Sequence, residues 1–90
     1  MIWKQVLELV DVQVIQVPVG AIILSAAEQN GNLCVWYQFV QESLPGQAVA
    51  QIEVRIVGTG NLGPGVNGFV FIDTVLMSNG LVWHVFCTYP

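Results

Sequence analysis

Three glycines between residues 54 and 68, in VRIVGTGNLGPGVNG, have the spacing G-x-G-x-x-G: Gly58, Gly60 and Gly63. After an apolar, β-branched run, this spacing is typical of the turn that holds the pyrophosphate of a dinucleotide. That chemistry requires a helix after the third glycine, because the helix N-terminus binds the phosphates. Here the next residues are PGVNG, which do not start a helix, and no Walker lysine follows. The dinucleotide interpretation is therefore rejected.

Two interpretations of this glycine-rich segment remain. In the first, the glycines only let a loop turn sharply between two strands. In the second, backbone N–H groups of the turn form an anion-binding nest, which needs no helix. Arg55 supports the second interpretation, because on the polar face of its strand a free guanidinium can make bidentate contacts with a carboxylate or phosphate. We therefore predict a binding surface formed by Arg55, Gly58, Thr59, Gly60 and Asn61.

His84 is the only histidine, and it alternates with Val82, Phe86 and Thr88 along an apolar run. A histidine in that company is more often a hydrogen-bonded structural residue than a ligand or a catalyst, but we include it among the candidate binding residues. Metal binding needs three or four ligands, and one histidine with two distant cysteines, Cys34 and Cys87, gives no such set. We predict no metal, no cofactor, no catalytic residue and no enzymatic activity.

Aromatic residues are further candidates for a binding surface. Trp36 is the tryptophan most suited to an outward position, since its neighbours on one face of the strand, Cys34 and Gln38, are the less apolar half of that segment. An outward tryptophan can anchor a protein interface or stack on a base. If a nucleotide binds near Arg55, we expect Trp36 to stack on its base.

The composition limits the possible partners. Hydrophobic residues make up 54% of the 90 residues, charged residues only 9%, and the net charge is −4. Two cations cannot support binding to duplex nucleic acid or a polybasic membrane contact. So few charges leave apolar surface uncovered, which predicts a homo-oligomer. We expect a cytoplasmic protein with reduced thiols, since no signal peptide or membrane-spanning run is recognisable.

Alternating apolar and polar residues predict an all-β single domain over residues 1–90, with about seven short antiparallel strands. In QIEVRIVG, for example, Ile52, Val54 and Ile56 share one face of the strand. Asn30-Gly31 and Asn79-Gly80 predict two hairpins, 21–29 with 33–40 and 69–77 with 81–89. Two further strands are expected at 2–10 and 12–17. Whether the strands form a sandwich or a small barrel is left open.

Several local features accompany this prediction. Pro45-Gly46 and Pro64-Gly65 mark longer loops. A change of apolar phase between Val14 and Ile15 predicts a bulge, and Pro18 should end its strand or lie on an edge. Asp73 is expected either to protect an edge strand or to pair with Arg55, and Glu53 could pair with Lys4. In the alternative to a binding role, Arg55 is only a salt-bridge partner of Glu53 or Asp73.

Four segments in this order and spacing resemble a family of short phage and prophage proteins known only as a domain of unknown function: PVGAIILSA (18–26), NLCVWYQFV (32–40), VRIVGTGN (54–61) and GLVWHVF (80–86). The distinguishing motifs are G-T-G after a strand and the terminal V-[WF]-H-V-F. The residue after G-T-G is commonly histidine in that family, whereas this chain has Asn61. The resemblance implies a phage-borne origin and no established activity.

Together these observations predict a phage-encoded, non-enzymatic binding protein acting in the host cytoplasm. It would antagonise a host defence or another host factor, either by binding a host protein or by sequestering a small anionic ligand such as a signalling nucleotide. The alternative is a structural or accessory β-module of the phage particle.

Overall fold

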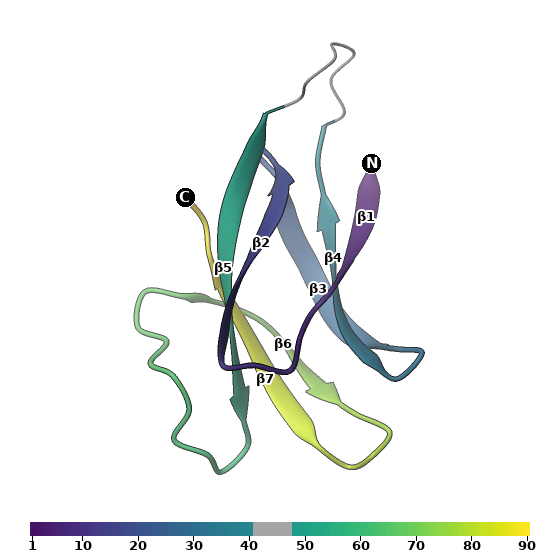
Figure 1. Cartoon of the computed structure of the whole chain (residues 1–90), viewed down its shortest axis with the longest axis vertical. Helices are drawn as coiled ribbons and strands as arrows, with labels where there is room; N and C mark the ends of the chain where they lie inside the picture. Colours follow the sequence, from purple (N-terminus) through teal and green to yellow (C-terminus); the bar gives the residue numbers. More distant parts are fainter. Residues whose placement is uncertain (41–47) are drawn as a thin grey trace.

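The computed structural model describes residues 1–40 and 48–90, and in these residues the regular structure consists of seven β-strands (Figure 1). All the strand pairs are antiparallel. The strands are β1 (Ile2–Val6), β2 (Val12–Pro18), β3 (Ile22–Gln29), β4 (Asn32–Gln38), β5 (Val49–Gly58), β6 (Val70–Leu76) and β7 (Val82–Thr88). The predicted all-β class is confirmed.

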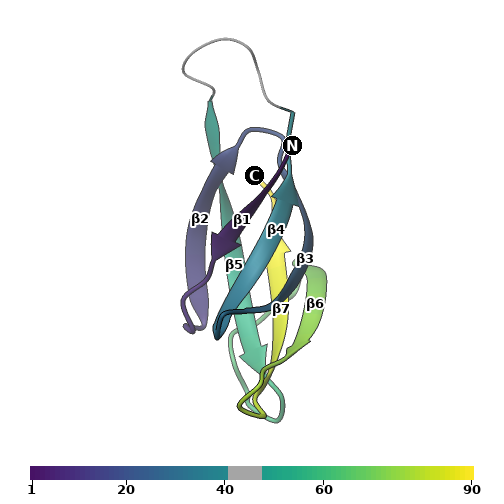
Figure 2. The same cartoon turned by 90° about the vertical axis from the view of Figure 1, so that its right-hand side faces the viewer.

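The strands form two sheets, one of three strands in the order β1-β4-β3 and one of four in the order β2-β5-β7-β6. The sheets are layered as a sandwich, which answers the question of sandwich or barrel. Figure 2 shows β1 and β2 at one rim of the two layers and β3 and β6 at the other.

The core lies between the sheets and follows from the period-two pattern of each strand. Ile52, Val54 and Ile56 of β5 point inward and are at most 3% exposed. From β4 and β7, the core receives buried side chains at alternate positions, namely Leu33, Val35, Tyr37, Val85 and Cys87. Apart from Cys34, which is also fully buried, the residues between them are partly exposed on the outer faces. The strands that build the core therefore also determine which side chains the outer faces present.

Both predicted Asn-Gly hairpins are present, with different turns. Asn30 and Gly31 both have positive φ (52° and 80°), as a two-residue type I′ turn requires. In the β6–β7 hairpin only Gly80 has positive φ (89°), and Met77 N donates to Leu81 O at 2.8 Å. The second hairpin therefore has a three-residue loop, the form in which a glycine takes the left-handed position.

Three local predictions need correction or qualification. The first strand ends at Val6 rather than at residue 10, because residues 7–11 cross from the three-stranded to the four-stranded sheet. The predicted bulge in β2 is wrong, since its register with β5 is continuous from Val12 to Pro18. Val14 is 55% exposed on the outer face. An apolar residue at an outward position gives the same sequence pattern as a change of apolar phase, which explains the wrong prediction. The Pro45-Gly46 loop lies outside the described residues.

Candidate functional site

The candidate site lies on the outer face of the four-stranded sheet, where β5 and β7 lie side by side. Arg55 and Val57 of β5 point away from the core, because Val54, Ile56 and Gly58 occupy the buried positions between and after them. Across the strand pair, Arg55 is opposite Phe86 and Val57 is opposite His84. The register thus brings together two of the predicted residues, Arg55 and His84.

At the end of β5 the chain makes the predicted glycine turn. Asn61 N donates to Gly58 O at 3.1 Å, and Gly60 has a φ of 82°, which favours glycine. Thr59 N donates to Val82 O at 3.3 Å. Two N–H groups of the expected anion nest are therefore used within the fold, which weakens the nest interpretation.

Beyond this turn, the loop of residues 59–69 (the glycine loop) folds back over the outer face of β5. The phenylalanine ring of Phe69 lies 4.2 Å from Arg55 Cζ, and Arg55 Nη1 donates a hydrogen bond to Gly65 O. Gly63 has a φ of 56°, and a Cβ there would lie 2.9 Å from Val57 Cγ1. Only glycine permits this approach, so the loop packs closely on the sheet.

The expectation that the Arg55 guanidinium is free is wrong. Besides the bond to Gly65, Arg55 Nε forms an ion pair with Glu53 Oε2 at 2.7 Å, and the two side chains are 27% and 31% exposed. The suggested pairing of Arg55 with Asp73 is also wrong, because Asp73 accepts a hydrogen bond from Ala26 N. Arg55 therefore fastens the glycine loop to β5 while remaining partly accessible.

His84 connects three segments of the outer face. Its Nε2 lies 2.7 Å from Thr59 Oγ1, and its Nδ1 lies 3.0 Å from Thr74 Oγ1. The structure thus brings Thr59 of the glycine turn to His84, as the predicted surface requires. Sequence reasoning missed Thr74, which lies opposite His84 in the β6–β7 register. Counting back from the Asn79-Gly80 turn could have identified it, once the length of the loop was known.

A hydroxyl next to a histidine resembles the nucleophile and base of hydrolases. In those enzymes a carboxylate or an amide orients the histidine on its other nitrogen. Here that partner is the neutral hydroxyl of Thr74, and a neutral imidazole donates from one nitrogen and accepts at the other. The arrangement satisfies both ring nitrogens and fixes the glycine turn to β6 and β7.

Arg55 shares this face with three phenylalanines, of which Phe69 contacts it and Phe86 lies opposite it in the β5–β7 register. Phe71 and Phe86 lie opposite each other in the β6–β7 register, with ring centroids 5.5 Å apart in an edge-to-face arrangement. Phe71 is 54% exposed. Arg55, Phe69, Phe71 and Phe86 form what we call the arginine–phenylalanine cluster. It was not predicted as a unit, because Phe69 reaches it only through the fold of the glycine loop.

Trp36 does not belong to this surface. In its sheet it lies opposite Lys4 of β1 and Ser25 of β3, on the outer face of the three-stranded layer. The prediction that Trp36 faces outward is confirmed, since its strand neighbours Val35 and Tyr37 are buried while it is partly exposed. The core separates it from Arg55, so it cannot stack on a base bound there.

Lys4 is also on this face of the three-stranded sheet, where its Nζ donates to Gln29 Oε1 at 2.5 Å. Glu53 belongs to the other sheet and pairs with Arg55. The suggested Lys4–Glu53 pair is therefore wrong.

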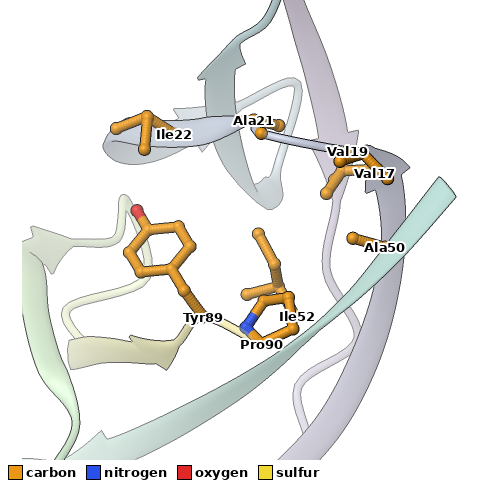
Figure 3. A pocket seen from close by; sticks show the side chains of 9 residues that line it. Val17, Val19, Ala21, Ile22, Ala50, Ile52, Tyr89 and Pro90 are labelled. Atoms are coloured by element: carbon orange, nitrogen blue, oxygen red, sulfur yellow. The ribbon is translucent and has the colours of Figure 1, made fainter. Parts of the chain in front are cut away.

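Two of the hollows formed by the described residues concern the candidate site and its surroundings. A pocket of about 260 Å³ lies at the start of β3 and is lined mostly by apolar side chains, including Val17, Ile22 and Pro90 (Figure 3). Its one hydroxyl, on Tyr89, accepts a hydrogen bond from Ile23 N at 2.9 Å. The second hollow, of about 330 Å³, adjoins the glycine turn beside Trp83.

Within residues 1–40 and 48–90, no three His, Cys, Asp or Glu side chains are grouped so that they could hold a metal ion. The same residues contain no helix with the length and apolar character needed to cross a membrane.

A family model described as "Domain of unknown function (DUF7352)" matches residues 1–90. No curated protein and no solved structure matches the chain.

Proposed function

We propose a function from the geometry of the outer face, starting from the fact that the chain belongs to this DUF7352 family of unknown function. The protein is a phage-encoded, non-enzymatic binding protein. It antagonises a host defence or another host factor by binding a protein through the outer face of its four-stranded sheet.

The arginine–phenylalanine cluster is the observation that supports this proposal. Interfaces between proteins are enriched in aromatic residues and arginine, and such residues dominate the binding energy when they are held rigidly. Arg55 is held by Glu53 and the Phe69 ring, and Phe71 is held against Phe86. The cluster is thus prepared for a partner, which lowers the entropic cost of binding.

A protein partner agrees better with this geometry than a small anionic ligand such as a nucleotide. Arg55 Nε and Nη1 already bond to Glu53 and Gly65. The N–H groups of Thr59 and Asn61 are also used. Trp36, the candidate base-stacking residue, is on the other sheet. The partly exposed aromatic rings, in contrast, offer the apolar contact area that a protein interface uses.

The test compares two exposed apolar residues on opposite outer faces, Phe71 (54% exposed) and Leu24 (46% exposed). Tagged wild-type protein, Phe71→Ser and Leu24→Ser are used to capture host proteins during infection, and the affinity for the captured protein is then measured. Truncation of a central aromatic anchor costs about 2 kcal/mol or more, roughly thirty-fold in Kd. We expect this loss for Phe71→Ser and unchanged binding for Leu24→Ser, with both variants folded by circular dichroism. Equal binding by wild type and Phe71→Ser would refute the proposal.

The second candidate is a structural or accessory module of the phage particle. Large apolar side chains are exposed on both outer faces, such as Ile22 on one and Val14 and Leu76 on the other, as expected for a subunit with several neighbours. Mass spectrometry of purified particles distinguishes the two functions. Stoichiometric amounts of the protein in the particle would favour the structural role, and its absence there would favour the host-binding role.

A further inference from the structure

One edge of β2 has backbone groups that do not bond to β5. Ile56 N donates to Asp11 O at 3.1 Å, and Val19 N donates to Ala48 O at 3.0 Å. Both bonds fit the β2–β5 register, in which hydrogen-bonded pairs alternate with non-bonded ones. The odd-numbered residues of β2 therefore bond to β5. The N–H and C=O groups of Val12, Val14 and Gln16 point away from the sheet.

Nothing in the described chain blunts this edge. β2, with the sequence VQVIQVP, contains no charged residue, and its register has no bulge. Its proline, Pro18, is the last residue. Among the described residues, no side chain bonds to the backbone of Val12, Val14 or Gln16. Figure 2 shows β2 as the outermost strand of its layer. Natural proteins seldom leave such an edge without protection unless another strand pairs with it.

We propose that β2 pairs antiparallel with β2 of a second copy of this chain, about a two-fold axis through Val14. Since only Val12, Val14 and Gln16 have outward backbone groups, the register is restricted. Val14 pairs with Val14 of the second copy, and Val12 pairs with Gln16 of that copy. The two four-stranded sheets then form one sheet of eight strands. This inference does not depend on the proposed function.

The properties of the strand favour a second copy as the occupant. A strand that pairs with itself about a two-fold axis must be self-complementary. β2 meets this condition because each outward residue offers both a donor and an acceptor, and because no like charges come to face each other. The central pair joins two β-branched valines, which is a favourable cross-strand pair.

The edge of β1 is less self-complementary than the edge of β2. The bonds between Met1 and Phe39 and from Leu7 N to Leu33 O place Ile2, Lys4 and Val6 on the outward side of β1. A two-fold pairing centred there would set Lys4 against Lys4 of the other copy. In addition, Gln5 Nε2 already donates to Val6 O at 3.0 Å.

The dimer also affects the candidate site. A two-fold axis through an antiparallel pair is perpendicular to the sheet, so both outer faces point to the same side. The two arginine–phenylalanine clusters would then be presented together, and a partner with two equivalent sites would bind with avidity.

Cysteine crosslinking tests the register. In the proposed pairing, Val14 faces Val14 of the second copy at a Cα separation of about 5.5 Å, within reach of a disulfide. The two Val12 residues are four positions out of register, roughly 13 Å apart along the strand. The native Cys34 and Cys87 are fully buried and do not interfere in the folded protein. Under mild oxidation of the full chain, we expect Val14→Cys to form a covalent dimer rapidly and Val12→Cys to remain uncrosslinked. Equal crosslinking of the two variants, or none in either, would overturn the proposal.

A second measurement uses mass in solution. Val14→Lys puts two like charges opposite each other, and Val70→Lys, at a residue that is 50% exposed at the other rim, is the matched control. By light scattering at micromolar concentration, we expect a dimer of the 9.8 kDa chain for wild type and Val70→Lys, and a monomer for Val14→Lys. A monomeric wild type would contradict the proposal, and so would a wild type whose β2 pairs only with a strand of another protein. A dimer that persists in Val14→Lys would contradict it as well.

Discussion

The two rims of the sandwich end in edge strands of different construction. At one rim, β3 has a register shift between Ile23 and Ser25, and β6 has one between Phe71 and Asp73. At the other rim, β1 and β2 run in continuous register with their neighbours. Bulges bend a strand and interrupt the row of backbone groups along its edge, and they are a common protection against pairing.

Side chains add to this protection at the β3–β6 rim. Asp73 Oδ2 accepts a hydrogen bond from Ala26 N at 3.3 Å, and Glu28 Oε2 accepts one from Ser78 N at 2.9 Å. Tyr89 accepts one from Ile23 N. Backbone donors at the rim are thus satisfied by side chains from the opposite sheet, which also ties the two sheets together. We call this rim the closed rim and the β1–β2 rim the open rim.

This difference suggests a division of roles. The closed rim stabilises the fold and is unsuited to strand addition, whereas the open rim contributes less to the fold and keeps an edge available for pairing. Equivalent substitutions at the two rims should therefore change the free energy of unfolding by unequal amounts.

The largest loss of stability is expected for Asp73→Ala. This change leaves Ala26 N and Thr74 N without the carboxylate that accepts from them, and a partly buried donor without its partner costs about 1–3 kcal/mol. The matched control is Asp11→Ala at the open rim, where the residue is exposed and a cost below about 0.5 kcal/mol is expected. Urea unfolding measures both variants. Equal losses would show that the closed rim has no special role in stability.

An intermediate change in the free energy of unfolding is expected at alkaline pH. Burial raises the pKa of the Cys87 thiol above its ordinary value, although a hydrogen bond with Tyr89 partly lowers it. Burial also raises the pKa of Tyr89. Above about pH 8.5 the unfolded chain releases the thiol proton while the folded chain retains it, so the free energy of unfolding falls as pH rises towards the folded pKa.

The slope of this decline is at most about 1.4 kcal/mol per pH unit for each group. It is measured by urea unfolding between pH 7 and pH 10. Cys87→Ala should reduce the slope in the first part of this range, whatever the variant does to stability at pH 7. A slope that is unchanged in Cys87→Ala would show that the thiol does not contribute to the decline.

Much of the fold could be predicted because local signals determine it. Period-two alternation in QIEVRIVG identified the inward residues of β5, and the Asn-Gly pairs identified both hairpins. Features that depend on the packing of the two sheets were not accessible. The positions of the bulges and the inward turn of Asp73 depend on how β3 meets β6, and no local pattern encodes this contact.

The candidate site was predictable only in part. Strand parity correctly placed Arg55 and Trp36 on outward faces, but parity does not say which sheet a strand joins. For this reason the sequence could not separate Trp36 from Arg55. The contacts of Arg55 with Gly65 and Phe69 were also hidden, since they arise from the return path of a loop rather than from any regular element.

The smallest change in the free energy of unfolding is expected for the outermost contact of the closed rim. Glu28 accepts from Ser78 N near the surface, so Glu28→Ala should cost about 0.5–1.5 kcal/mol, the net value of one hydrogen bond. Glu28→Gln keeps an acceptor oxygen and should lose less than the alanine variant. Glu8→Ala is the open-rim counterpart, because Glu8 contacts Gln13 only through its backbone N–H and C=O groups. Its loss of stability should therefore be the smallest of the three. If urea unfolding instead gave Glu8→Ala the same cost as Glu28→Ala, side-chain acceptors would not distinguish the rims, and the bulges alone would account for the protection of β3 and β6.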